Sequence, residues 1–327
     1  MRRVDRDRYI PVAFIENRED LQVRNRIRLP MVLASVALVP AQEAAASAFA
    51  GVRMFPVTLS IDDPGVSDEA SVPTFSFLPT DGENGRTNEY GFDFEWDKRI
   101  TEDFGVGVNW GWNIQQAVRG KTAGGFTNLE LAAKYKTYVN EEHEFLLTLG
   151  VVREIGGTGN ISKGADRFGS TEPKLYFGKG LGDLPIGLFR PLAVTGVFGY
   201  QIADVKINSA DNNLGNADMV NAGISVQYNM GYLQSQVRDL GFPEFVNRLI
   251  PIVELSWNVP IRSPVSDPTR FTVAPGILYV TDSWQVGVEA LIPGNTATGS
   301  HIGFIAQIHL FFDDIFPNSI GKPIAEW

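Results

Sequence analysis

The chain has no cysteine among its 327 residues, no excess of basic side chains and no long apolar run. The absence of cysteine excludes disulfides, thiolate catalysis and cysteine-based metal sites. The formal net charge of -10 leaves no basic footprint for nucleic acid, so no nucleic-acid partner is expected. No run of about eighteen residues is both apolar and free of charge, which argues against a transmembrane helix.

The N-terminal residues have the three parts of an export signal. A basic stretch, residues 24–28, precedes the apolar residues 29–39. A tract of small residues follows at 44–50 and offers A-x-A cleavage sites. We therefore expect residues 1–50 to be a leader and signal peptide that is removed on export.

About twelve later segments alternate between apolar and polar residues, as β-strands with two different surroundings do. In residues 301–312, for example, Phe304 and Ile308 alternate with Gln307 and His309, and Ile305 and Phe311 break the pattern. The predicted strands span residues 70–78, 88–96, 104–116, 126–139, 144–154, 170–181, 191–205, 218–232, 250–259, 271–280, 284–292 and 301–312.

A soluble sandwich and a membrane barrel both produce such alternation, so strand length has to separate them. Sandwich strands usually have about five or six residues, whereas a tilted transmembrane strand needs about ten. Several predicted strands have that length, and an even strand number suits a single-chain bacterial barrel. We predict an all-β fold: a transmembrane, antiparallel up-and-down β-barrel of about twelve strands over residues 70–312, in the outer membrane of a Gram-negative bacterium.

The segments that flank the barrel are predicted to be periplasmic. Residues 51–69 form an N-terminal segment and residues 313–327 a C-terminal tail. Both are candidates for docking a periplasmic protein partner or for plugging the periplasmic mouth. The first contains weak candidates for a metal site, but the turn sequence Asp-Pro-Gly favours a solvated turn. We therefore expect no metal and no cofactor. The weak metal candidates, which this expectation sets aside, are Asp62, Asp63, Asp68 and Glu69.

Residues 60–77 and 312–323 resemble the ends of the outer-membrane barrel family of the MetA pathway of phenol degradation, which is described as transporter-like. The resemblance extends over roughly residues 60–323. It implies an outer-membrane barrel that passes small molecules, including aromatic or hydrophobic ones. It supplies no functional residues that can be placed on this sequence.

The polar faces of the predicted strands supply candidates for the lining of a lumen. Both charge signs occur among them, which is compatible with a water-filled path and with a lumen plugged by ion pairs. The sequence does not distinguish a water-filled path from a plugged lumen. The candidates are Asp93, Glu95, Glu130, Lys134, Lys136, Lys174, Glu254, Gln285, Glu289, Gln307 and His309.

These features predict a porin-like channel for passive passage of small-molecule solutes, in contact with outer-membrane lipid. A structural barrel that anchors a periplasmic partner is the alternative. An outer-membrane lipid hydrolase is less favoured, because the sequence has no G-x-S-x-G elbow. Its histidines are His143 in a turn, His301 at a strand end and His309 on a polar face. We therefore expect no catalytic residues and no enzyme activity.

Overall fold

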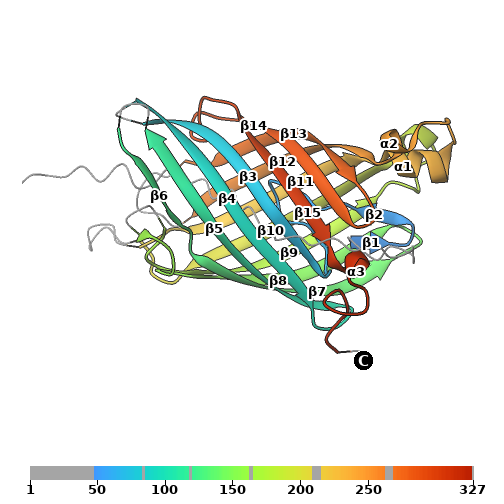
Figure 1. Ribbon diagram of the computed structural model, residues 1–327, viewed down its shortest axis with the longest axis horizontal. Helices are drawn as coiled ribbons and strands as arrows, with labels where there is room; N and C mark the ends of the chain where they lie inside the picture. Colours follow the sequence, from blue (N-terminus) through green and yellow to red (C-terminus); the bar gives the residue numbers. More distant parts are fainter. Residues whose placement is uncertain are drawn as a thin grey trace, which may run out of the picture.

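Antiparallel strands close into a tilted barrel around a lumen (Figure 1). The computed structural model describes residues 48–82, 85–117, 120–161, 165–207, 215–261 and 268–325. Thirteen strands form the wall. Two of them, β6 and β7, follow each other along the same side of β5 and together fill one place, so the wall is twelve strands around. The wall strands are β3 (Glu69–Gly82), β4 (Gly85–Arg99), β5 (Phe104–Ala117), β6 (Thr122–Phe126) with β7 (Leu129–Asn140), β8 (Phe145–Ile155), β9 (Ser170–Gly180), β10 (Leu192–Ala203), β11 (Asp218–Tyr228), β12 (Leu249–Ile261), β13 (Arg270–Val280), β14 (Trp284–Pro293) and β15 (Gly303–Phe311).

The last strand closes the barrel against the first. Phe304 of β15 lies opposite Phe77 of β3, and Leu310 lies opposite Ala70. β3 also pairs with β4, and β4 with β5, so neither β3 nor β15 is an exposed sheet edge. The predicted pairing of residues 301–312 with residues 70–78 is confirmed. Apart from β6, which pairs only with β5, every wall strand therefore has a hydrogen-bonded neighbour on both sides, as a hydrocarbon environment requires.

The outer surface of the wall is apolar and the inner surface largely polar. Val253 and Val288 are 40% and 47% exposed, whereas the neighbouring Glu254 and Glu289 are 0% and 1% exposed. This is the reverse of a soluble protein, in which the exposed face would carry the charges. A closed barrel with an apolar exterior is a transmembrane barrel, so the protein lies in the bacterial outer membrane.

Aromatic side chains on the outer face gather toward both ends of the strands. The rings of Trp110 and Phe126 stack at 4.3 Å, and the rings of Tyr279 and Trp284 lie 5.6 Å apart beside the turn at residues 281–283. Such rings mark the two membrane–water interfaces of a barrel.

One end of the barrel carries three short turns and both described chain ends, and the position of the chain ends identifies it as the periplasmic end. Two longer connections project there. The first contains η3 (Gly187–Phe189), and the second contains α1 (Met230–Tyr232), η5 (Leu233–Val237) and α2 (Glu244–Asn247). No helix in the described parts of the chain is long and apolar enough to cross a membrane.

The strand predicted over residues 218–232 is too long at its C-terminal end, because β11 ends at Tyr228. The side chain of Asn229 accepts a hydrogen bond from the backbone N–H of Tyr232 at 2.8 Å. This capping interaction begins a helical turn and ends the strand.

The C-terminal tail lies against the periplasmic rim. It begins with α3 (Phe312–Ile315), and Arg99 of β4 donates a hydrogen bond to the carboxylate of Asp313 at 2.9 Å. Further along, the backbone N–H of Ala325 donates to the carbonyl of Ile100 at 2.8 Å. The tail is therefore fastened to the turn that follows β4.

We predict that docking of this tail weakens as the pH rises from about 4 to about 8. Burial raises the pKa of Asp313 from 3.8 to about 8; Arg99 opposes the rise, while Asp68 and Glu69 add to it. Because the pKa is higher in the folded state, this contribution to stability is complete below the ordinary pKa and is lost as the pH passes through about 8. Limited proteolysis of the tail should become faster over that range in the native chain, and Asp313→Asn should remove the pH dependence. Equal pH dependence in both would contradict the prediction.

Candidate functional site: a polar lumen filled by the N-terminal segment

The N-terminal segment enters the barrel instead of remaining outside it. β1 (Ala48–Ala50) and β2 (Arg53–Phe55) form a small hairpin, and the chain then crosses the lumen before it joins β3. We call residues 53–68 the lumenal segment. Sequence reasoning placed residues 51–69 in the periplasm, where they would dock a partner or plug the periplasmic mouth, and assigned residues 48–50 to the leader. Residues 1–47 lie outside the described residues. The contacts below explain the position inside.

The carboxylate of Glu254 on β12 holds a tight turn of the lumenal segment. It accepts hydrogen bonds from the backbone N–H groups of Leu59, Ser60 and Ile61 at 2.7–2.9 Å and from the Ser60 hydroxyl at 2.6 Å. Four donors on one buried carboxylate satisfy backbone groups that would otherwise be unpaired inside the barrel. Glu254 is thus a structural anchor for the segment.

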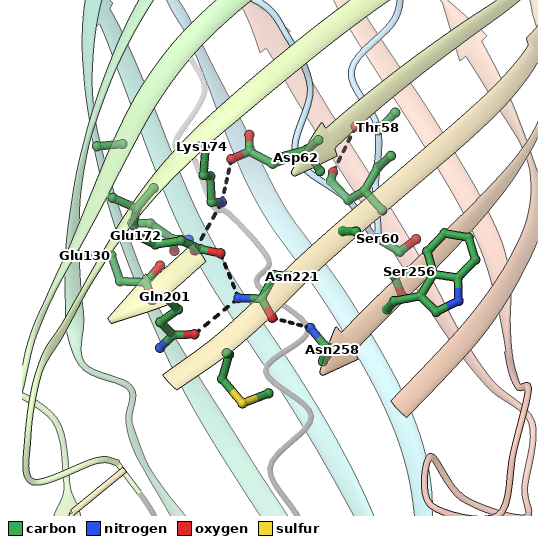
Figure 2. A pocket seen from close by; sticks show the side chains of 18 of the residues that line it. Thr58, Ser60, Asp62, Glu130, Glu172, Lys174, Gln201, Asn221, Ser256 and Asn258 are labelled. Carbon is green, nitrogen blue, oxygen red and sulfur yellow. Dashed lines mark hydrogen bonds and ion pairs between the residues drawn. The ribbon is translucent and has the colours of Figure 1, made fainter. Parts of the chain in front are cut away.

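Asp62 makes the second anchor, on the opposite side of the lumen. Its carboxylate lies 2.9 Å from Nζ of Lys134 on β7 and 3.0 Å from Nζ of Lys174 on β9. The hydroxyl of Tyr176 donates to the same carboxylate at 2.8 Å. Figure 2 shows Asp62 directed toward Lys174. The lumenal segment therefore bridges β12 on one side and β7 and β9 on the other.

Arg53 forms the third anchor at the periplasmic end. Its guanidinium donates two hydrogen bonds to one carboxylate oxygen of Glu144, at 2.9 and 3.0 Å, and lies 3.6 Å from the centre of the Tyr232 ring. It also donates to the carbonyls of Arg190 and Pro191. The arginine side chain is 0% exposed, so this ion pair is fully removed from water.

An apolar cluster lies inside the barrel, where a porin-like lumen would be expected to be polar. Val57 and Leu59 of the lumenal segment pack there against inward-facing side chains of β12–β15 and β3. Ile305 and Phe311, which break the alternation of β15, belong to this cluster and are 0% and 1% exposed. The breaks in alternation thus mark wall positions that face the lumenal segment. The wall members are Leu78, Ile250, Ile252, Ala274, Leu278, Val280, Leu291, Ile305 and Phe311.

Glycines in the wall make room for the segment at three positions. A methyl group on Gly223 would lie 2.5 Å from Ile61, and one on Gly287 would lie 2.8 Å from Leu59. A methyl group on Gly178 would lie 3.1 Å from the ring of Phe55. Wall and segment are complementary in shape as well as in charge.

We predict that Gly223→Ala lowers the free energy of unfolding by about 1–3 kcal/mol, because the added methyl overpacks against Ile61. Ile61→Gly removes the opposing side chain, so the double variant should cost less than the sum of the two single variants. Urea titrations of folding into lipid vesicles measure each value. Additive costs would mean that the two positions do not touch.

A cavity of about 290 Å³ lies next to the lumenal segment. Val57 and Asp62 border it on one side, and it reaches Asn216 and Pro268 beside the long connections of the opposite barrel end. Amide side chains form a connected network on its wall (Figure 2). Asn221 donates to Glu172 at 2.7 Å and to Gln201 at 3.2 Å, and Asn258 donates to Asn221 at 2.9 Å.

The candidates for a lumen lining fall into two groups. Lys136 lies at the periplasmic rim, 3.0 Å from Asp103, where the register of β7 with β8 shifts. The others are inside the barrel; among them, Glu254 and Gln285 bind the lumenal segment, Gln285 through the carbonyl of Val57 at 2.8 Å. The inward group consists of Asp93, Glu95, Glu130, Lys134, Lys174, Glu254, Gln285, Glu289, Gln307 and His309.

The four weak metal candidates are directed to different partners. Asp62 pairs with Lys134 and Lys174, whereas Asp68 pairs with Lys98 and Arg99 on β4. The backbone N–H of Gly65 donates to Asp63 at 2.7 Å. Glu69 lies 3.2 Å from His309. The described residues include no group of three or more metal-ligating side chains.

His309 lies between a serine and a glutamate, an arrangement that resembles the relay of serine hydrolases. Its Nδ1 is 2.7 Å from the hydroxyl of Ser71, and its Nε2 is 3.2 Å from Glu69. All three are at most 3% exposed, and none borders either of the cavities described in this barrel. The contact instead fastens β15 to β3 where their register shifts, between Gln307 and His309.

Comparison with known proteins gives structural likenesses and no sequence relatives. No protein family matches the sequence, and no curated protein matches it. The COG4313 outer membrane channel from Pseudomonas putida F1 is 12% identical with a TM-score of 0.49, covering 84% of this chain and 99% of that chain. A KdgM porin is 11% identical with a TM-score of 0.41, covering 73% and 97%. The β domain of the Bordetella autotransporter Brka is 14% identical with a TM-score of 0.44, covering 76% and 100%.

At these identities and TM-scores, the likenesses carry no argument about what this chain binds. The resemblance of residues 60–323 to the phenol-degradation family has no matching family to support it and stays a prediction.

Proposed function

We propose that this barrel is a channel for passive passage of small molecules across the outer membrane, and that the lumenal segment narrows its path. The observation that carries the proposal is the cavity of about 290 Å³ inside the wall, which ends at the lumenal segment. A barrel built solely to anchor a partner would have no need of a cavity lined by polar side chains. Barrels with about twelve strands are wide enough to hold both a segment and a cavity.

The lining favours small amphipathic solutes. Amides and carboxylates such as Asn221 and Glu172 supply hydrogen bonds, while Val152 and Met219 supply apolar surface. A solute with a polar group and a small apolar or aromatic body would satisfy both kinds of surface. This agrees with what the resemblance to the phenol-degradation family implies.

Conductance of the refolded protein in a planar bilayer tests the proposal. We expect discrete current steps from preparations whose barrel is intact, as judged by heat-modifiable migration on gels. An intact barrel that inserts but gives no steps, alone or with the lumenal segment removed, would contradict the channel.

Ion selectivity tests whether the inward lysines border the path. We predict that Lys134→Gln shifts the reversal potential in a salt gradient toward cation selectivity, because it removes a positive charge beside the cavity. Lys136→Gln removes the same charge at the rim and should give a smaller shift. Equal shifts would place the path away from Lys134.

A structural barrel that binds a periplasmic protein is the second candidate. The C-terminal tail supports it, because Ile320 and Ile324 are 48% and 68% exposed at the periplasmic rim. Site-specific photocrosslinking from position 324 in cells tests it. The barrel would then form the same crosslinked product in every preparation, and Ile320→Asp should abolish that product.

A further inference from the structure

We propose that a niche over Gly91 binds the primary ammonium group of a solute, so that the solutes taken by this barrel carry an amine. The inference rests on the proposed channel function and names its substrate class. Three oxygen atoms from neighbouring strands converge on this niche. They are Oγ of Ser76 on β3, Oδ2 of Asp93 on β4 and Oδ1 of Asn113 on β5.

The pairing of three strands creates the niche. Ser76 lies opposite Gly91, and Gly91 lies opposite Asn113, so the three residues form a row across β3, β4 and β5. Asp93 is two residues further along β4 and therefore shares the inner face with Gly91. The middle residue of the row has no side chain, which leaves an opening between two polar neighbours.

The distances suit a small donor. A methyl carbon on Gly91 would lie 2.5 Å from Oγ of Ser76, 3.3 Å from Oδ2 of Asp93 and 3.4 Å from Oδ1 of Asn113. A nitrogen placed slightly further into the lumen can therefore approach all three oxygens. A primary ammonium has three N–H donors, which matches three acceptors.

The charge of the niche favours a cation. Asp93 is 5% exposed, and its Oδ2 has no hydrogen-bond partner within the described residues. A buried carboxylate oxygen without a donor is destabilising, and an ammonium would supply both a donor and the opposite charge. A quaternary ammonium has the charge but no N–H groups, so it would not use the niche in this way.

The niche lies next to the main cavity. It is part of a second cavity of about 90 Å³, which is lined by Ser76, Gly91, Asp93 and Asn113. Asn109, Glu130 and Asp166 border both cavities, so only side chains stand between the two. The lysines of the main cavity, Lys134 and Lys174, are both paired with Asp62. An arriving amine therefore meets carboxylates along the route, which attract cations.

Binding can be measured without transport, by isothermal titration calorimetry of the detergent-solubilised barrel with propylamine. We expect saturable binding that Asp93→Asn weakens at least tenfold, or roughly the value of one charge-assisted hydrogen bond. Glu142→Gln removes the same charge from an exposed periplasmic turn that borders neither cavity and serves as the matched control, with little expected change. Tetramethylammonium should bind at least tenfold more weakly than propylamine.

Two further variants guard against misfolding. Ser76→Ala removes a neutral acceptor, and Gly91→Ala fills the niche; both should weaken binding while heat-modifiable migration stays native. The proposal is overturned if Asp93→Asn binds propylamine as tightly as the native chain, which would indicate that Asp93 is protonated or shares a proton. Equal weakening by Asp93→Asn and Glu142→Gln would reduce the effect to general electrostatics and overturn the proposal. Propylamine binding without conductance would support the ammonium niche and contradict the proposed channel function.

Discussion

A chain that begins at Ser67 should conduct ions about tenfold better than a chain that begins at Ala48, because most of the lumenal segment no longer fills a lumen that twelve strands enclose. The segment crosses the lumen between Glu254 on β12 and Lys134 on β7. Its removal also takes the apolar side chains of Val57 and Leu59 out of the barrel interior. Single-channel recording in a planar bilayer measures the conductance.

Removal of residues 316–325 is the matched control for loss of a terminal segment. This tail lies at the rim and should change the conductance little. Unchanged conductance after removal of the lumenal segment, in a barrel that still shows heat-modifiable migration, would mean that the segment does not restrict the path. Glu254→Gln provides a milder test, because it weakens one anchor without shortening the chain.

The second large effect concerns the stability of the periplasmic end. Arg53→Met should lower the free energy of unfolding by about 3–5 kcal/mol, since it leaves the carboxylate of Glu144 buried without its cation. The tyrosine hydroxyl of Tyr232 still donates to Glu144 at 2.7 Å, but it carries no charge. Urea titration of the vesicle-folded protein measures the loss.

A double variant separates the ion pair from the packing. Adding Glu144→Gln to Arg53→Met removes the unpaired charge, so most of the lost stability should return. We chose glutamine because Glu144 has a positive φ of 49°, and a bulky β-branched residue would be strained there. If the double variant is as unstable as Arg53→Met, the loss comes from the aliphatic part and ring contact of Arg53.

Alternation predicted the wall well because a membrane barrel imposes a simple physical rule on each strand. β12 illustrates it: Val253 faces lipid and Glu254 faces the lumen, and the sequence pattern distinguishes them directly. The closing partner of residues 301–312 also followed, since an even-stranded barrel must join its last strand to its first. Alternation did not predict the exact ends of the strands, as the early end of β11 at Tyr228 shows.

The contents of the barrel were not predictable in the same way. Nothing in residues 51–69 alone states which environment they occupy, because their partners are separated from them by up to 245 residues of chain. Asp62 illustrates this: it looked like part of an acidic turn, and its partners Lys134 and Lys174 lie on strands whose register the sequence does not give. The informative signal was a failure of alternation. Ile305 and Phe311 are apolar on an inner face and so require an apolar neighbour inside the barrel.

The side-chain nature of the contacts with the lumenal segment has a mechanical consequence. Within the described residues, no main-chain hydrogen bond joins residues 56–66 to a strand of the wall. Wall side chains such as Glu254, Lys134 and Thr148 hold the segment. The wall and the lumenal segment are therefore separable: the segment can leave through the periplasmic mouth without breaking a backbone hydrogen bond of the sheet. The barrier to that movement depends on these side chains and on the packing of Val57 and Leu59, so a few substitutions can change it while the wall stays the same.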